Sequence, residues 1–180
     1  MDKSEVAHIL TKYSTAMVSS CTFYYSPSIP TKKLMNAISA YAIGVDPDSV
    51  IGLIDMTIFG NAKEGFLFTT EGMYYRETLS SPYYINYSSI DRLDFGDTWS
   101  KKDCSKTLYI YQPEQVLSIS TTFINKPPLM NALNELKDLS CGIAIGGTIS
   151  TDTPGKKSIS HKPQFFNIPS NLCKSGKYYY

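Results

Sequence analysis

The chain has 180 residues, a net charge of +1 and 42% hydrophobic residues, including 14 tyrosines and 8 phenylalanines. This length predicts one domain with a tail, and the apolar content excludes a largely disordered chain. The near-neutral charge argues against a nucleic-acid binder that uses its whole surface. Because aromatic residues favour strands, the composition favours a β-rich fold.

Residues 1–49 predict a helical segment. Ser4 is the expected cap of a first helix over residues 4–19, whose apolar stripe has helical spacing: Val6, Ile9, Leu10, Tyr13 and Met17. The stretch 21–30 predicts a break, because Pro27 and Pro30 interrupt it. A second helix is expected to begin near Thr31 and to end before Gly44.

Residues 50–141 predict an antiparallel sheet followed by a helix. Short aromatic and β-branched runs indicate seven strands, at 50–59, 65–70, 73–79, 83–90, 92–99, 106–111 and 115–121. Two prolines then open a helix at 127–140, a position where proline is tolerated. The predicted class is therefore α+β, with two N-terminal helices, seven strands and a C-terminal capping helix.

Two glycines separate the early strands, and two interpretations of them are distinguishable. Gly65 and Gly72 each follow an acidic residue and each lead into another predicted strand. A phosphate-binding loop would instead lead from a strand into a helix. We therefore expect turns between antiparallel strands, with Gly72 supplying a positive φ to a tight hairpin.

The strand region resembles a bacterial pleckstrin-homology-like (PH-like) family over about residues 50–140. The positions that carry this resemblance are Gly60, Lys63, Gly65, Thr69, Gly72, Tyr75, Ile85, Tyr87 and Ile90. The resemblance implies a seven-strand PH-like sheet or barrel closed by the C-terminal helix. It implies little about function, because PH-like domains are scaffolds for many partners.

Catalytic and metal-binding patterns are weak in this sequence. The four cysteines, Cys21, Cys104, Cys141 and Cys173, form no CxxC pair, and no GxSxG motif occurs. We expect no enzyme activity, no metal and no cofactor. The spacing of the thiols and the absence of a clear signal segment favour a reducing, cytoplasmic location.

Asp55 is the one charged residue of its predicted strand. A buried carboxylate is costly unless it is paired or hydrogen-bonded. We expect Asp55 to accept hydrogen bonds from the turn at residues 60–65 or to pair with Lys63, rather than to act as a catalytic group.

The tail, residues 142–180, differs from the body in charge and composition. It carries five lysines against one aspartate, whereas residues 1–150 carry 12 basic and 15 acidic residues. It also keeps large apolar groups such as Phe165 and Phe166. We expect the tail to pack on the body, with a binding role as the alternative. Its lysines are sparse for binding nucleic acid.

Paired tyrosines suggest how the body meets a partner. Neighbouring strand residues point to opposite faces, so each Tyr-Tyr pair sends one ring outward, either as an interface anchor or as simple cover for the sheet. The expected partner-binding residues are Glu71, Tyr74, Glu77, Tyr83, Asp91, Asp94 and Asp97.

The predicted function is non-enzymatic protein binding. Its concrete form is a toxin-neutralising immunity protein, because an acidic body suits a basic toxin. The alternative is a PH-like module that associates with an anionic lipid surface through its basic tail.

Overall fold

The computed structural model describes residues 1–95 and 107–142, which belong to one compact unit, Met1–Gly146. The end of the predicted strand at 92–99 and nearly all of the predicted tail lie outside these residues. The described helices are α1 (Lys3–Met17), α2 (Thr31–Tyr41) and α3 (Lys126–Ser140), with short 3-10 helices at Pro47–Ser49 and Tyr87–Ser89. The mixed α+β class predicted from the sequence is confirmed.

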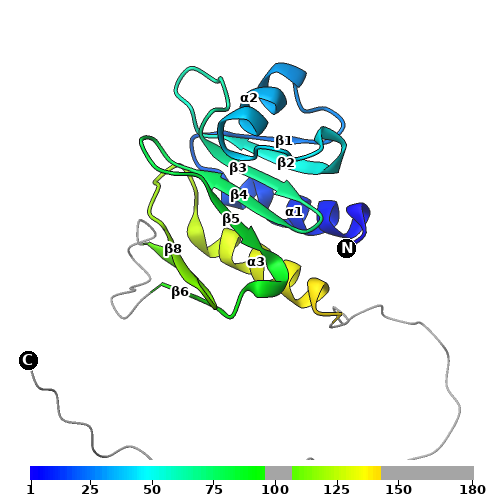
Figure 1. The fold of residues 1–180 in the computed structure, drawn as a ribbon, viewed down its shortest axis with the longest axis vertical. Coiled ribbons are helices and arrows are strands. Elements are labelled where there is room, and N and C mark those ends of the chain that lie inside the picture. The colour runs from blue at the N-terminus through cyan, green and yellow to red at the C-terminus, as the bar shows by residue number, and fades with distance from the viewer. Residues whose placement is uncertain (96–106, 143–180) are drawn as a thin grey trace, which may run out of the picture. The chain divides into compact units, whose positions relative to one another are not determined.

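The strands form two antiparallel sheets (Figure 1). The first sheet has the order β1-β2-β3-β4-β5, with bounds Thr22–Tyr25, Val50–Asp55, Gly65–Thr69, Gly72–Arg76 and Tyr83–Asn86. The second sheet has the order β6-β7-β8, with bounds Arg92–Asp94, Leu108–Gln112 and Gln115–Ile119. The expected single set of seven strands is thus replaced by eight described strands in separate sheets.

The additional strand is β1, in the stretch predicted to be a break. Its sequence, TFYY, is β-branched and aromatic, and it pairs antiparallel with β2, Phe23 opposite Ile54. The prolines that suggested a break come only after the strand ends. A short strand bounded by turn residues is therefore easily mistaken for a loop.

The helices begin and end close to their predicted positions. The cap of α1 is Asp2, whose carboxylate accepts a hydrogen bond from the backbone amide of Ser4 at 2.8 Å, so Ser4 is not the cap. The predicted apolar stripe of this helix is confirmed, because Val6, Ile9, Leu10 and Met17 are buried and Tyr13 is half-buried.

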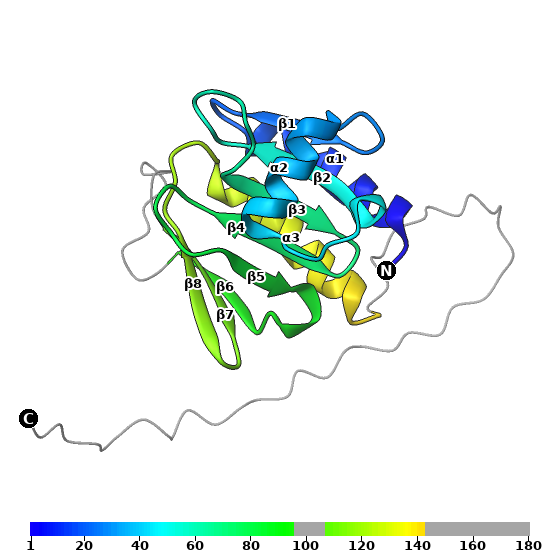
Figure 2. The ribbon, with the colours of Figure 1, turned by 45° about the horizontal axis from the view of Figure 1, so that its top comes forward.

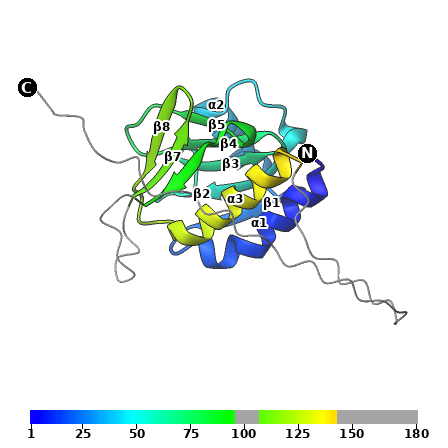
Figure 3. The same cartoon turned by 90° about the horizontal axis from the view of Figure 1, so that it is seen from below.

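Helices cover both faces of the five-stranded sheet (Figure 2). On one face α2 buries Ala37, Ile38 and Tyr41 against Leu53 and Leu67. On the other face α1 and α3 lie side by side (Figure 3) and share a larger apolar core with the inner side of the second sheet. Because β2 and β3 are covered on both faces, their sequences are nearly continuous apolar runs rather than alternating ones.

The two glycines are the first residues of β3 and β4, so each leads from a turn into an antiparallel strand rather than into a helix. Gly65 has φ +137° and pairs with Asp55, and a Cβ there would lie 1.9 Å from the carbonyl oxygen of Ile54. The expectation that Gly72 takes a positive φ is wrong. Gly72 is required for space instead, because a Cβ would lie 2.4 Å from the carbonyl oxygen of Ile85.

Candidate functional site

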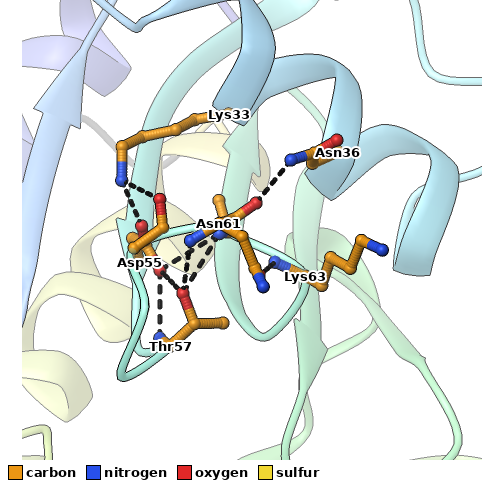
Figure 4. Close-up of polar contacts among 8 residues, drawn as sticks. Lys33, Asn36, Asp55, Thr57, Asn61 and Lys63 are labelled. Carbon is orange, nitrogen blue, oxygen red and sulfur yellow. Dashed lines mark hydrogen bonds and ion pairs between the residues drawn. The ribbon is translucent and has the colours of Figure 1, made fainter.

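Asp55 is a buried carboxylate at the end of β2, where β3 and α2 approach it (Figure 4). Lys33 of α2 donates from Nζ to its Oδ2 at 2.5 Å. The backbone amides of Thr57 and Ala62 donate to its Oδ1 at 3.0 and 3.2 Å. Burial alone raises the pKa of Asp55, but the hydrogen bonds from Lys33 and Thr57 together hold it below its usual value.

The predicted environment of Asp55 is partly confirmed. The turn does donate to the carboxylate, through the amide of Ala62. The ion-pair partner, however, is Lys33 and not Lys63. The backbone amide of Lys63 bonds to Asn61 Oδ1, while its side chain extends away from Asp55 (Figure 4). Proximity in sequence suggested Lys63, whereas packing of α2 against the sheet supplies the partner.

The same network holds the β2–β3 loop, residues 56–64, against α2. Lys33 also donates to the carbonyl oxygen of Gly60. Asn36 donates from Nδ2 to the carbonyl oxygen of Asn61 at 2.8 Å, and the amide of Asn61 donates to Thr57 Oγ1 at 2.8 Å. The loop backbone is therefore held by hydrogen bonds with α2, with Asp55 at the end of β2 and among the loop residues themselves.

This fixed loop exposes two large apolar side chains. Ile58 is 87% exposed and Phe59 is 92% exposed. At the same end of the sheet Leu79, in the β4–β5 connection, is fully exposed. Thr78 joins the two loops by donating to Glu64 Oε2 at 2.7 Å. We call Ile58, Phe59 and Leu79 the apolar loop end.

Sequence reasoning missed the apolar loop end. It assigned Ile58 and Phe59 to a buried strand over residues 50–59, but β2 ends at Asp55. The signal present in the sequence was the Gly60-Asn61 pair immediately after the two apolar residues, which is typical of a turn.

A tyrosine-lined notch lies at the opposite end of the same sheet. Tyr74 of β4 and Tyr84 of β5 pair across the strands, with ring centroids 4.6 Å apart and an interplanar angle of 35°. The notch has a volume of about 260 Å³, and its lining includes Ile43, Val45, Thr70, Glu71, Tyr74 and Tyr84. We call this feature the tyrosine notch.

Among the described residues, the tyrosine notch contains two of the predicted partner-binding residues, Glu71 and Tyr74. Tyr83 pairs with the buried Tyr75 in the register and so belongs to the other face of the sheet. Glu77 follows β4 at the loop end. The remaining residues are elsewhere: Asp91 and Asp94 lie at β6, and Asp97 is outside the described residues.

The expected contrast between one core-facing ring and one outward ring holds for the pair Tyr74 and Tyr75. Tyr75 is buried and Tyr74 is half-exposed. Tyr83 and Tyr84 instead expose similar fractions, 38% and 36%, because β5 is the edge strand of its sheet. Tyr84, which faces Tyr74, was not among the predicted binding residues.

Neither a metal-binding cluster nor a membrane-spanning helix occurs within residues 1–95 and 107–142. No group of three or more His, Cys, Asp or Glu side chains in that part of the chain is arranged to hold a metal ion. Likewise, none of the helices described there combines the length and apolar character needed to cross a membrane.

Cys21 donates from Sγ to the carbonyl oxygen of Phe123 at 3.3 Å, and burial raises the pKa of its thiol to about 11.

Comparison with protein-family models, with curated proteins and with solved structures gives no significant match to this chain. The PH-like resemblance therefore stays a prediction.

Proposed function

We propose that this chain is a non-enzymatic protein-binding module. The observation that carries the proposal is the apolar loop end, in which Ile58, Phe59 and Leu79 are each at least 87% exposed. Large apolar side chains exposed on neighbouring loops are typical of interaction sites, and covering them with a partner is favourable. Aromatic anchors such as Phe59 are typical of the few residues that dominate binding energy.

The fixed loop backbone supports this proposal further. Lys33, Asn36 and Asp55 hold the loop that carries Ile58 and Phe59 (Figure 4). A surface that is ordered before it meets its partner loses less conformational entropy on association. The hydrogen bonds of Asp55 would therefore aid binding by ordering this loop, with no catalytic role for the carboxylate.

The order of the elements also supports a binding scaffold. Strands β2 to β8 are seven antiparallel strands followed by α3, which is the order that a PH-like domain implies. We propose that residues 50–141 form a PH-like core, to which β1 adds an edge strand. A scaffold of this kind presents loops to partners, so its function resides in the loops and edges.

The concrete form we propose is a toxin-neutralising immunity protein that masks its partner's active site. The net charge of −3 over residues 1–150 would steer association with a basic partner. The alternative, attachment to an anionic lipid surface, depends on lysines beyond residue 150, which lie outside the described residues.

The first experiment identifies the partner. The tagged full chain is isolated from its native cells, and the co-eluting protein is identified and then titrated by calorimetry. A basic protein that binds one-to-one and loses its activity supports the immunity form. A chain that elutes alone and shows no saturable protein binding rejects the proposed function.

The second experiment tests the surface. The double variant Ile58→Ser/Phe59→Ser should weaken partner binding by about thirtyfold, a loss of about 2 kcal/mol typical of a hot spot. Val116→Ser is the matched control, because Val116 is 55% exposed on β8, in the other sheet. Equal affinity for the double variant and the control rejects the apolar loop end as the contact. Loop-dependent binding to anionic vesicles would favour a membrane instead.

A further inference from the structure

We propose that the tyrosine notch holds an arginine side chain of the protein partner. The inference rests on the proposed function in that the arginine belongs to a protein, but it does not depend on the apolar loop end. It assigns the notch a ligand chemistry from the charge, the aromatic faces and the shape of its walls.

The first element is a carboxylate on a fixed turn. The hydroxyl of the buried Thr69 accepts hydrogen bonds from the amides of Glu71 and Gly72, at 3.3 and 3.2 Å. The carbonyl oxygen of Glu71 accepts from the amide of Tyr87 at 3.1 Å. The Glu71 side chain is exposed, and no ion pair joins it to another residue within 1–95 and 107–142. The turn thus presents a carboxylate for an outside cation.

The second element is an aromatic platform beside that carboxylate. Tyr74 and Tyr84 pack with centroids 4.6 Å apart, and Tyr84 lies over Gly72, where a Cβ would approach its Cε2 to 2.7 Å. Because Gly72 has no side chain, the ring of Tyr84 can lie against the backbone at this position. Burial raises the pKa of both phenols and the charge of Glu71 adds to the rise, so the carboxylate acts on both rings.

The third element is an apolar wall. Ile43 is 82% exposed beside the notch, and Val45 is half-buried in its lining. Such a wall suits the methylene groups of a long side chain, while the rings and Glu71 suit its charged end. An anion would be repelled by Glu71, and a purely apolar ligand would bury its carboxylate without a partner.

These elements favour arginine over lysine. A planar guanidinium stacks on aromatic faces and forms two parallel hydrogen bonds with a carboxylate, whereas an ammonium is a strongly hydrated point charge. A basic partner of the kind proposed above would offer arginine on its surface. The notch would then be a second anchor, at the other end of the sheet from Phe59.

The test uses the full chain with ring-labelled tyrosine and N-acetyl-arginine amide as the probe. Two-dimensional NMR should show saturable shifts of the Tyr74 and Tyr84 ring signals. Glu71→Gln should lower the affinity for the probe about tenfold, as expected for the loss of a hydrogen bond to a charged group. Glu114→Gln is the control, because Glu114 is an exposed carboxylate in the β7–β8 turn.

Several outcomes would overturn the inference. They are no saturable shift of either ring, an equal response to N-acetyl-norleucine amide, or equal probe affinity in the Glu71→Gln and Glu114→Gln chains. The inference and the proposed function fail separately. Probe binding without any protein partner removes the proposed function alone. A partner whose affinity depends on Phe59 but is unchanged by Glu71→Gln removes the arginine notch alone.

Discussion

Lys33 Nζ lies 2.5 Å from Asp55 Oδ2 and joins the first turns of α2 to the end of β2. Only 2% of the Asp55 side chain is exposed, against 20% of the Lys33 side chain. The lysine thus reaches a buried charge from a position that is still partly hydrated. This ion pair stabilises the end of the five-stranded sheet from which the loop with Ile58 and Phe59 projects into solvent.

Asp55→Ala should destabilise the fold strongly. The change removes a buried acceptor of hydrogen bonds from Lys33, Thr57 and Ala62, and breaking a buried ion pair from one side typically costs about 3 kcal/mol or more. Urea denaturation measures the free energy of unfolding. Lys63→Ala is the control and should stay within about 0.5 kcal/mol of the parent chain, because Lys63 is exposed. An equal loss in both variants would reassign the ion pair to Lys63.

Acid should destabilise the parent chain more than Asp55→Asn. The folded pKa of Asp55 lies below its unfolded value, so its contribution is fully present above the unfolded pKa of about 3.9 and is lost as pH falls through the folded pKa. The melting temperature should therefore fall more steeply below about pH 5 in the parent chain. Glu135 also has a lowered pKa, through Lys12 and Tyr13 despite its burial, so some slope remains in the variant. Parallel curves for the two chains would contradict this assignment.

Local patterns predicted the helices and most strands because each is encoded by nearby residues. The apolar stripe of α1, the prolines that open α3 and the turn before Gly65 needed no information from distant parts of the chain. The partner of Asp55 did need it, because Lys33 lies 22 positions away and arrives with α2. The apolar periodicity of the two segments does not indicate that Lys33 would lie beside Asp55.

The division of the strands into two sheets was also beyond local patterns. A run such as β6 looks the same whether it continues the first sheet or begins another. Likewise, the alternation rule places Tyr74 and Tyr75 on opposite faces, but only the register shows that Tyr84, not Tyr83, faces Tyr74. The prediction therefore identified Glu71 and Tyr74 of the tyrosine notch but missed Tyr84, the second aromatic ring of the notch.

Gly65→Ala should prevent folding or destabilise it by several kcal/mol. Its φ of +137° is unsuited to a side chain, and the new Cβ would lie 1.9 Å from the backbone oxygen of Ile54, which the sheet holds in place. Gly44→Ala is the matched control, because Gly44 also has a positive φ, +86°, but nothing lies within 4 Å of the added Cβ. That variant should lose about 1 kcal/mol. Similar losses, measured by thermal unfolding, would show that conformation rather than space limits both sites.

Thr69→Val should weaken both the fold and the tyrosine notch. The hydroxyl of Thr69 accepts from two amides of the turn and donates to the carbonyl oxygen of Gly72 at 3.0 Å, so an isosteric valine leaves buried polar groups unpaired at a cost of about 1–3 kcal/mol. Thr69→Ser keeps the hydroxyl and should lose only about 1 kcal/mol for the missing methyl group. Because the same hydroxyl orients Glu71, the valine variant should also bind N-acetyl-arginine amide more weakly than the serine variant at temperatures where both are folded. Equal probe affinity would mean that Glu71 keeps its position without Thr69, through the bond from Tyr87 alone.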